Sequence, residues 1–257
     1  MTPARAMRWA SVLSVALIVS AWRPLTIPTG AEIVRSMHDK YAGKWFKTLT
    51  FVQQTTRQTK DGKDTVQTWY EAASLPGRLR IDVGKPSEGN GVLYRNDSTY
   101  QMTAGSLDKA VAGGNPLLPL LFDVYVAPVN QTLADVKNEL KIDLSKVRQS
   151  TWDGRPVYVI GADSGNERAP QVWIDTERLV VLRQIFAFGS DSSPTYIDGQ
   201  LKQYRPIGKS WIAPQCEFYI AGKLLQREDY TDIKADVPLS ESLFDPAQWK
   251  TAPHWLH

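Results

Sequence analysis

Short runs of alternating apolar and polar residues, separated by turn residues, limit the possible folds of this chain more than any other feature. In the run RLRIDV, residues 78–83, the apolar side chains Leu79, Ile81 and Val83 alternate with charged ones. A period of two places the apolar set on one face of a β-strand and the charged set on a solvated face. Further strand-like runs cover 48–59, 65–73, 91–95, 98–103, 155–162, 171–174, 179–188, 196–204, 215–221 and 223–232. Tight turns such as Asp-Gly join several of them, which predicts antiparallel pairing.

Helical patterns occur before the first strands and again in the middle of the chain. Residues 29–32, Thr-Gly-Ala-Glu, have the pattern of a capping box. Asn-Pro at 115–116 is typical of a helix start. The following segment, 117–126, is apolar almost all round, and residues 133–140 have one apolar face. A helix that is apolar all round must be covered on all sides, so we expect 117–126 to lie across the mouth of a curled sheet.

The order of these elements predicts a mainly β fold with a few helices, of the α+β class. Strands and helices do not alternate as they do in parallel sheets, and a sheet of this many strands curls or closes instead of staying flat. The sequence shows no linker that would divide the chain. We therefore predict one domain, residues 22–257, built on a curled antiparallel sheet with an N-terminal helix.

The N-terminal residues predict export. Two arginines precede an apolar stretch at 9–19, and Val19-Ser20-Ala21 provides the small residues of a cleavage site, the pattern of a secretory signal peptide. The alternative is a membrane anchor. Only residues 9–22 lie between flanking arginines, which is short of the ~20 residues that a spanning helix needs. We therefore expect residues 1–21 to be a signal peptide that is cleaved near Ala21.

Charge and motif content argue against several classes of function. The net charge is +3 with the signs mixed along the chain, so we expect no nucleic-acid partner. The single cysteine, Cys216, cannot form an intramolecular disulfide or a cysteine-based zinc site. The histidines are His38, His254 and His257, and the last two lie in a tail, 251–257, that we expect to be solvated.

Nucleophile-elbow, phosphate-loop and HExxH motifs are all missing. We expect no catalytic residue, metal or cofactor, although a paired-carboxylate site stays open.

The apolar strand faces have two possible explanations. For any single residue an ordinary core is the commoner one, whereas the all-round apolar segment favours the wall of a ligand cavity. The residues predicted to line such a cavity are Leu79, Ile81, Val83, Tyr100, Met102, Val172, Ile174, Leu182, Phe186 and Phe188. The residues predicted to cover it as a lid are Leu117, Leu118, Leu120, Leu121, Phe122 and Tyr125.

Several segments together resemble the LolA/LolB-like superfamily of periplasmic lipoprotein carriers. They are TLTFVQQTTR (48–57), LPGRLRID (75–82), the Val-Trp-Ile-Asp hairpin (172–175), YRPIGKSWIAP (204–214) and PLSESLFDPAQW (238–249). The resemblance implies an incomplete antiparallel β-barrel, with a helical lid over an apolar cavity that receives acyl chains. It also implies a periplasmic location, reached by secretion across the inner membrane.

The resemblance implies a soluble, secreted carrier of lipids or lipoprotein acyl chains that is not an enzyme. Its expected partners are acyl chains and membrane-anchored donor and acceptor proteins. Leu75 stands where the carriers commonly have a basic residue before the corner proline. Two alternatives therefore stay open: lipid storage or sensing, including an envelope stress-sensing or interaction domain of the same fold, and a secreted hydrolase on a β scaffold.

Overall fold

The computed structural model describes residues 27–59, 61–189 and 192–256. The predicted signal peptide, residues 1–21, lies outside these described residues. Within them, no helix combines the length and the apolar character that crossing a membrane requires.

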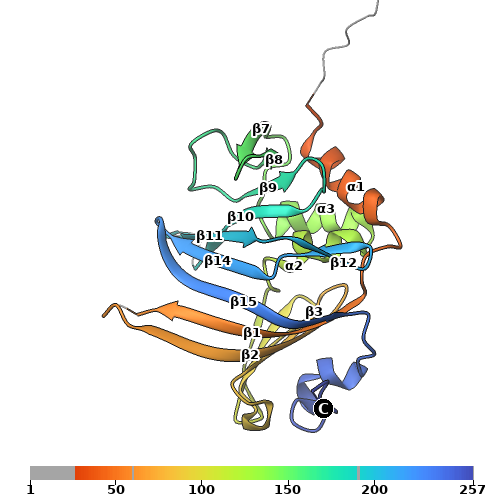
Figure 1. Cartoon of the computed structure of the whole chain (residues 1–257), viewed down its shortest axis with the longest axis vertical. Coiled ribbons are helices and arrows are strands. Elements are labelled where there is room, and N and C mark those ends of the chain that lie inside the picture. Colours follow the sequence, from red (N-terminus) through yellow and green to blue (C-terminus); the bar gives the residue numbers. More distant parts are fainter. Residues whose placement is uncertain (1–26, 60, 190–191, 257) are drawn as a thin grey trace, which may run out of the picture.

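One antiparallel sheet dominates the described part of the chain (Figure 1). Its 13 strands run in the spatial order β6 (Ser106–Ala112), β5 (Ser98–Thr103), β4 (Gly91–Arg95), β3 (Arg78–Val83), β2 (Asp64–Ser74), β1 (Thr48–Gln58), β15 (Lys223–Ala235), β14 (Gln215–Ile220), β11 (Thr195–Lys202), β10 (Val181–Phe188), β9 (Gln171–Asp175), β8 (Arg155–Ile160) and β7 (Val147–Trp152). A separate hairpin pairs β12 (Arg205–Ile207) with β13 (Ser210–Ile212). The remaining elements are helical: α1 (Gly30–Tyr41), η1 (Pro86–Glu88), α2 (Leu118–Leu121), η2 (Asp123–Tyr125), α3 (Val129–Asn138), η3 (Glu241–Phe244) and η4 (Pro246–Gln248).

The connectivity explains why the sheet is curled but open. Strand β1 pairs with β15 from the far end of the chain, which joins the first six strands to the rest. The two unpaired edges are β6 and β7, which are consecutive along the chain. The segment between them, with α2, η2 and α3, therefore connects one edge of the sheet to the other. These features confirm the predicted curled antiparallel sheet and incomplete barrel.

Helix α1 begins at the predicted capping box. The backbone N–H of Glu32 donates to Thr29 Oγ1 at 3.2 Å, and the backbone N–H of Thr29 donates to Glu32 Oε2 at 2.7 Å, so two otherwise unpaired N–H groups are satisfied. The apolar stripe of the helix, with Ile33, Val34 and Met37, is buried. It packs against η2 and the inner face of the sheet, where the main hydrophobic core lies.

The segment 115–126, which we call the lid segment, differs from the single helix expected over 117–126. It forms a four-residue helix, α2, and a single 3-10 turn, η2, separated at Phe122, whose φ of −133° lies outside the helical region. The break turns the chain so that the Tyr125 ring stacks on Trp45 with centroids 3.7 Å apart. Turn hydrogen bonds from Phe122 N–H to the Leu118 carbonyl and from Tyr125 N–H to the Phe122 carbonyl continue on either side of the break.

Strand β3 is buried on both faces, so the solvated face expected for it is wrong. Arg80 and Asp82 on its outer face are 2% and 0% exposed. The cover is the C-terminal segment, residues 239–256, which packs Leu243, Phe244 and Trp249 onto this side of the sheet. Figure 1 shows the blue C-terminal end of the chain beside this part of the sheet. A second, smaller core therefore lies outside the curl.

The tail 251–257, which we expected to be solvated, is docked over most of its described length. His254 Nε2 lies 3.2 Å from Asp82 Oδ2, and the His254 side chain is only 17% exposed. Trp249, just before the tail, fits because the facing residue is Gly91, where a Cβ atom would lie within about 3 Å of the Trp249 ring. The C-terminal segment is therefore an integral part of the fold.

Candidate functional site

A cavity of about 320 Å³ lies inside the curl, between the sheet and the lid segment. Its wall is formed by the inner faces of β1–β4, β10, β11, β14 and β15, by the β12–β13 hairpin with its flanking residues, and by the lid segment. Apolar and aromatic side chains supply most of the wall. The size and character of this cavity match those of a small-molecule site.

Eight of the sixteen residues predicted for the cavity and its lid line it. Those from the strands are Leu79, Ile81, Phe186 and Phe188, and those from the lid segment are Leu117, Leu118, Leu121 and Phe122. Phe188 is 66% exposed, so it lies where the cavity meets solvent. The alternation of β3 and β10 thus places side chains of the expected type on the hollow side.

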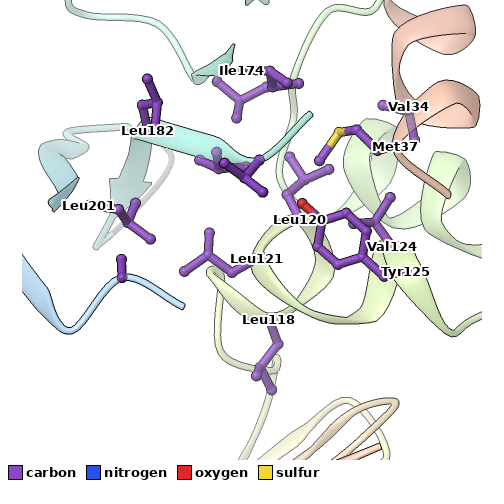
Figure 2. Packing of buried hydrophobic residues seen from close by; sticks show 14 of the residues in the cluster. Val34, Met37, Leu118, Leu120, Leu121, Val124, Tyr125, Ile174, Leu182 and Leu201 are labelled. Atoms are coloured by element: carbon purple, nitrogen blue, oxygen red, sulfur yellow. The ribbon is translucent and has the colours of Figure 1, made fainter. Parts of the chain in front are cut away.

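Val172, Ile174 and Leu182, also predicted as cavity lining, belong to the solid core. They are buried within the main hydrophobic cluster and do not contribute to the cavity wall. Figure 2 shows Ile174 and Leu182 on the strand side of this cluster and Met37 on its helix side. This part of the inner face is filled because α1 and the lid segment pack on it. Val83 also lies outside the lining and packs half-buried against the same cluster.

The positions expected for Tyr100 and Met102 are wrong, because their strand presents them on the opposite face of the sheet. Met102 pairs with Gly91 and Tyr100 with Leu93, and Leu93 pairs with the outward-facing Arg80. Both side chains belong to the smaller core under the C-terminal segment. Spacing alone gave no indication of which face of this strand is the inner one.

Two of the six predicted lid residues point away from the cavity. Leu120 is fully buried, and Figure 2 shows it beside Met37 and Val124, whereas Leu121 points toward Leu201 of β11. The hydroxyl of Tyr125 donates to the carbonyl of Leu179 at 3.0 Å, which fixes this end of the lid segment to the core. The lid segment therefore has one face in the core and one face on the cavity.

An aromatic part of the wall was missed by the sequence reasoning. It comprises Phe51, Trp69, Tyr94, Trp211, Phe218 and Tyr230. The Phe51 and Tyr230 rings are tilted against each other with centroids 4.4 Å apart. Phe51, Trp69 and Tyr230 stand in strands rich in Thr, Gln and charged residues, so no continuous apolar stripe marked them. Each of their strands holds only one aromatic residue or two adjacent ones, so no periodic signal identified the inner face.

Two carboxyl groups, Glu71 of β2 and Glu228 of β15, also line the cavity. Burial raises the pKa of Glu71 well above its usual value, and the charge of Glu228 adds to this effect. Burial also raises the pKa of Glu228, although hydrogen bonds from Tyr230 and Gln226 oppose the shift. Among the described residues that line the cavity, none is Lys, Arg or His. The same described part of the chain contains no group of three His, Cys, Asp or Glu side chains arranged to hold a metal ion.

The side-chain hydrogen bonds of the lid segment to the sheet are made by residues on either side of α2. Helix α2 itself is held by apolar contacts. The backbone N–H of Gly77 donates to Asp123 Oδ1 at 3.0 Å, and Gln184 Nε2 donates to the carbonyl of Pro116 at 2.9 Å. Burial raises the pKa of Asp123 to about 7, an effect that the Gly77 N–H opposes and that the charges of Asp135 and Asp97 reinforce.

We expect the substitution Asp123→Asn to flatten the dependence of stability on pH. The unfolded chain loses the Asp123 proton near pH ~3.9, whereas the folded protein keeps it up to about pH 7. Over this interval the folded state binds the extra proton, so the free energy of unfolding falls as pH rises. Glu71 and Glu228 act with the same sign, so part of the slope remains. Urea unfolding at pH 5 and pH 8 measures the slope, and an equal slope in the variant and the original protein would contradict the expectation.

An open, curled antiparallel sheet with a helical segment over an apolar cavity is an incomplete β-barrel. No protein-family model matches the sequence, and no curated protein matches it. Solved structures do match the fold. A candidate outer membrane lipoprotein-sorting protein domain from Vibrio parahaemolyticus superposes with a TM-score of 0.56 at 12% identity, over 86% of this chain and 98% of that one.

Two further structures give the same result. A LolA superfamily protein from Nitrosomonas europaea has a TM-score of 0.55 at 14% identity, over 85% of this chain and 98% of that one. A DUF1329 family protein from Desulfovibrio piger has a TM-score of 0.56 at 14% identity, over 86% of this chain and 97% of that one. The chain therefore has the fold of the LolA superfamily, as its sequence segments indicated.

Proposed function

We propose that this protein binds acyl chains non-covalently in its cavity and acts as a lipid or lipoprotein-acyl carrier of the cell envelope. The observation that carries the proposal is the lidded cavity of about 320 Å³ with its mainly apolar and aromatic wall. Each methylene group transferred from water into such a wall contributes ~0.8 kcal/mol. A chain of about a dozen carbons therefore binds without any covalent step.

The proposed location is the periplasm, and the proposed partners are membrane-anchored proteins that donate and accept the acyl cargo. The N-terminal export pattern and the LolA-like fold support this assignment. Leu75 is buried at the corner before β3, where the carriers commonly have a basic residue, and the lid segment contacts this corner through Asp123 and Gly77. Storage or sensing of the same acyl ligand, without handover, is therefore the nearest alternative.

Binding is tested on residues 22–257, purified under mild conditions. Extraction and mass spectrometry are expected to identify acyl lipids that co-purify with the protein. After delipidation, a fluorescent fatty-acyl probe is expected to bind with one site per chain and to be displaced by unlabelled lipid. Delipidated protein that is folded, as judged by circular dichroism, and yet binds no acyl probe would sink the proposal.

The carboxyl pair Glu71 and Glu228 is the one observation that favours a hydrolase, because two carboxyl groups can serve as an acid and a base. A hydrolase would cleave acyl esters bound in the cavity, and Glu71→Gln would abolish this hydrolysis. A carrier is expected to bind the same esters and release them unchanged. Mass spectrometry of the ligand after prolonged incubation distinguishes the two functions.

A further inference from the structure

The acyl-binding cavity contains an acidic site that its apolar wall does not explain. Glu71 is 5% exposed, lines the cavity, and receives no hydrogen bond from the described residues. Its neighbours across the sheet on either side are Phe51 and Ile81, neither of which offers a polar group. A buried carboxyl group without a partner is costly, so its place at the cavity surface points to a partner supplied by a ligand.

A second unpaired polar group lies next to Glu71. Trp69 is two residues away on the same face of β2 and also lines the cavity. The indole N–H of Trp69 is buried and has no acceptor in the described part of the structure. Glu228 lies two strands away on β15, and its oxygens accept from Tyr230 at 2.6 Å and from Gln226 at 2.5 Å. The polar groups of the cavity are thus concentrated on β2 and β15.

The surroundings of this acidic site contain little positive charge. The ionisable groups that line the cavity around the two glutamates are Tyr94 of β4, Cys216 of β14, Tyr230 of β15 and Tyr204 before β12. The cation that acts on Glu228 is Arg57 near the end of β1, which donates to Gln226 and lies over the Trp69 ring, 5.2 Å from its centroid. Arg80 and Asp82 of β3 face the other side of the sheet.

We propose that the cavity prefers alkyl or acyl chains that carry a cationic amine, with the ammonium group held by Glu71 against the aromatic wall and favoured by the nearby charge of Glu228. The proposal rests on the proposed acyl-binding function and specifies its ligand class. An ammonium group gains charge-assisted hydrogen bonds to the Glu71 carboxylate and cation–π contacts with the aromatic side chains of the wall. A fatty-acid carboxylate could accept from the unpaired Trp69 N–H, but it would be repelled by Glu71 and Glu228 once these are ionised, with Arg57 as the nearby cation.

Binding of an ammonium group is expected to release protons from the two carboxyl groups. The two carboxyl groups hold their protons in the free cavity to a higher pH than usual, because burial disfavours their charged forms. An incoming ammonium group favours the carboxylates, so binding releases protons to solvent. Affinity for the amine therefore rises as pH rises through the range in which the two carboxyl groups lose their protons, whereas affinity for an uncharged alcohol of the same chain length does not share this rise.

The test is competition against a bound fluorescent acyl probe by dodecylamine, dodecanoate and dodecanol, each kept as monomers. At pH 7 we expect dodecylamine to displace the probe at a concentration at least about tenfold lower than dodecanoate, the effect of one favourable charge contact. The near-isosteric variants Glu71→Gln and Glu228→Gln are expected to reduce this ratio while keeping dodecanol affinity. Glu241→Gln, a change at a side chain that is 79% exposed outside the cavity, serves as the matched control.

The outcomes separate this proposal from the carrier function. If dodecanoate and dodecylamine compete equally well, or dodecanoate competes better, the amine preference is overturned while acyl binding stands. If the preference survives both glutamine variants, the assignment to Glu71 and Glu228 is overturned. If none of the three amphiphiles competes and the probe itself does not bind, both proposals fail together.

Discussion

Replacing Arg80 with alanine is expected to lower the free energy of unfolding by about 3–5 kcal/mol, the usual cost of removing one partner from a buried ion pair. Arg80 Nε and Nη2 each donate to Asp82 at 2.8 Å, and the side chains are 3% and 0% exposed. The guanidinium also lies 3.8 Å from the centroid of the Trp249 ring and donates to the carbonyl of Trp249. The substitution thus leaves a buried carboxylate behind and removes the main attachment of the C-terminal segment.

Urea unfolding measures this effect, and Arg78→Ala on the same strand is the matched control. Arg78 pairs with Glu241, whose side chain is 79% exposed, so its loss is expected to cost about 1 kcal/mol or less. The double variant Arg80→Leu with Asp82→Leu removes both charges and is expected to be more stable than Arg80→Ala. A loss of about 1 kcal/mol or less for Arg80→Ala, like that expected for Arg78→Ala, would show that the buried ion pair contributes little to the fold.

This ion pair also shows where sequence reasoning reached its limit. Alternation in residues 78–83 correctly predicted a strand and the direction of Leu79 and Ile81, because both depend on local backbone geometry. The burial of Arg80 and Asp82 depends on the C-terminal segment, about 160 residues later in the sequence. The local sequence pattern around β3 cannot predict a contact with so distant a segment. The sequence did hold one indication. Residues 243–255 contain four large apolar side chains, Leu243, Phe244, Trp249 and Trp255, which predicts that the C-terminal segment packs against another part of the protein.

The cavity was predictable in outline because it too depends on features that are local in the sequence. Hairpin turns and strand periodicity predicted a curled sheet, and the composition of 117–126 predicted a cover. The partition between core and cavity was not predictable, because Val172 and Phe186 both face the inner side of the sheet and differ only in whether helices fill the space above them. Glu71 was missed because a carboxyl group in a strand is normally solvated, and only the tertiary fold reveals its burial.

Replacing Leu121 with glutamate is expected to leave the fold standing and to weaken acyl binding by at least about 100-fold. Leu121 lies on the cavity face of the lid segment and points toward Leu201. A glutamate at this position places a charge at the wall of an apolar cavity, where an acyl chain would otherwise pack. Relief by outward movement of α2 would restore solvation of the charge, but it would also uncover the cavity.

The neighbouring substitution Leu120→Glu provides the control, because Leu120 is fully buried on the core face of the same helix. We expect it to prevent folding, since a charge there has neither a partner nor a route to water. Circular dichroism and urea unfolding establish which variants fold, and titration with the fluorescent acyl probe measures binding. If Leu121→Glu also fails to fold, α2 is ordinary core and does not act as a lid. If it folds and binds the probe as tightly as the original protein, the acyl chain does not lie under α2, and the ligand site must be sought at the Phe188 end of the cavity.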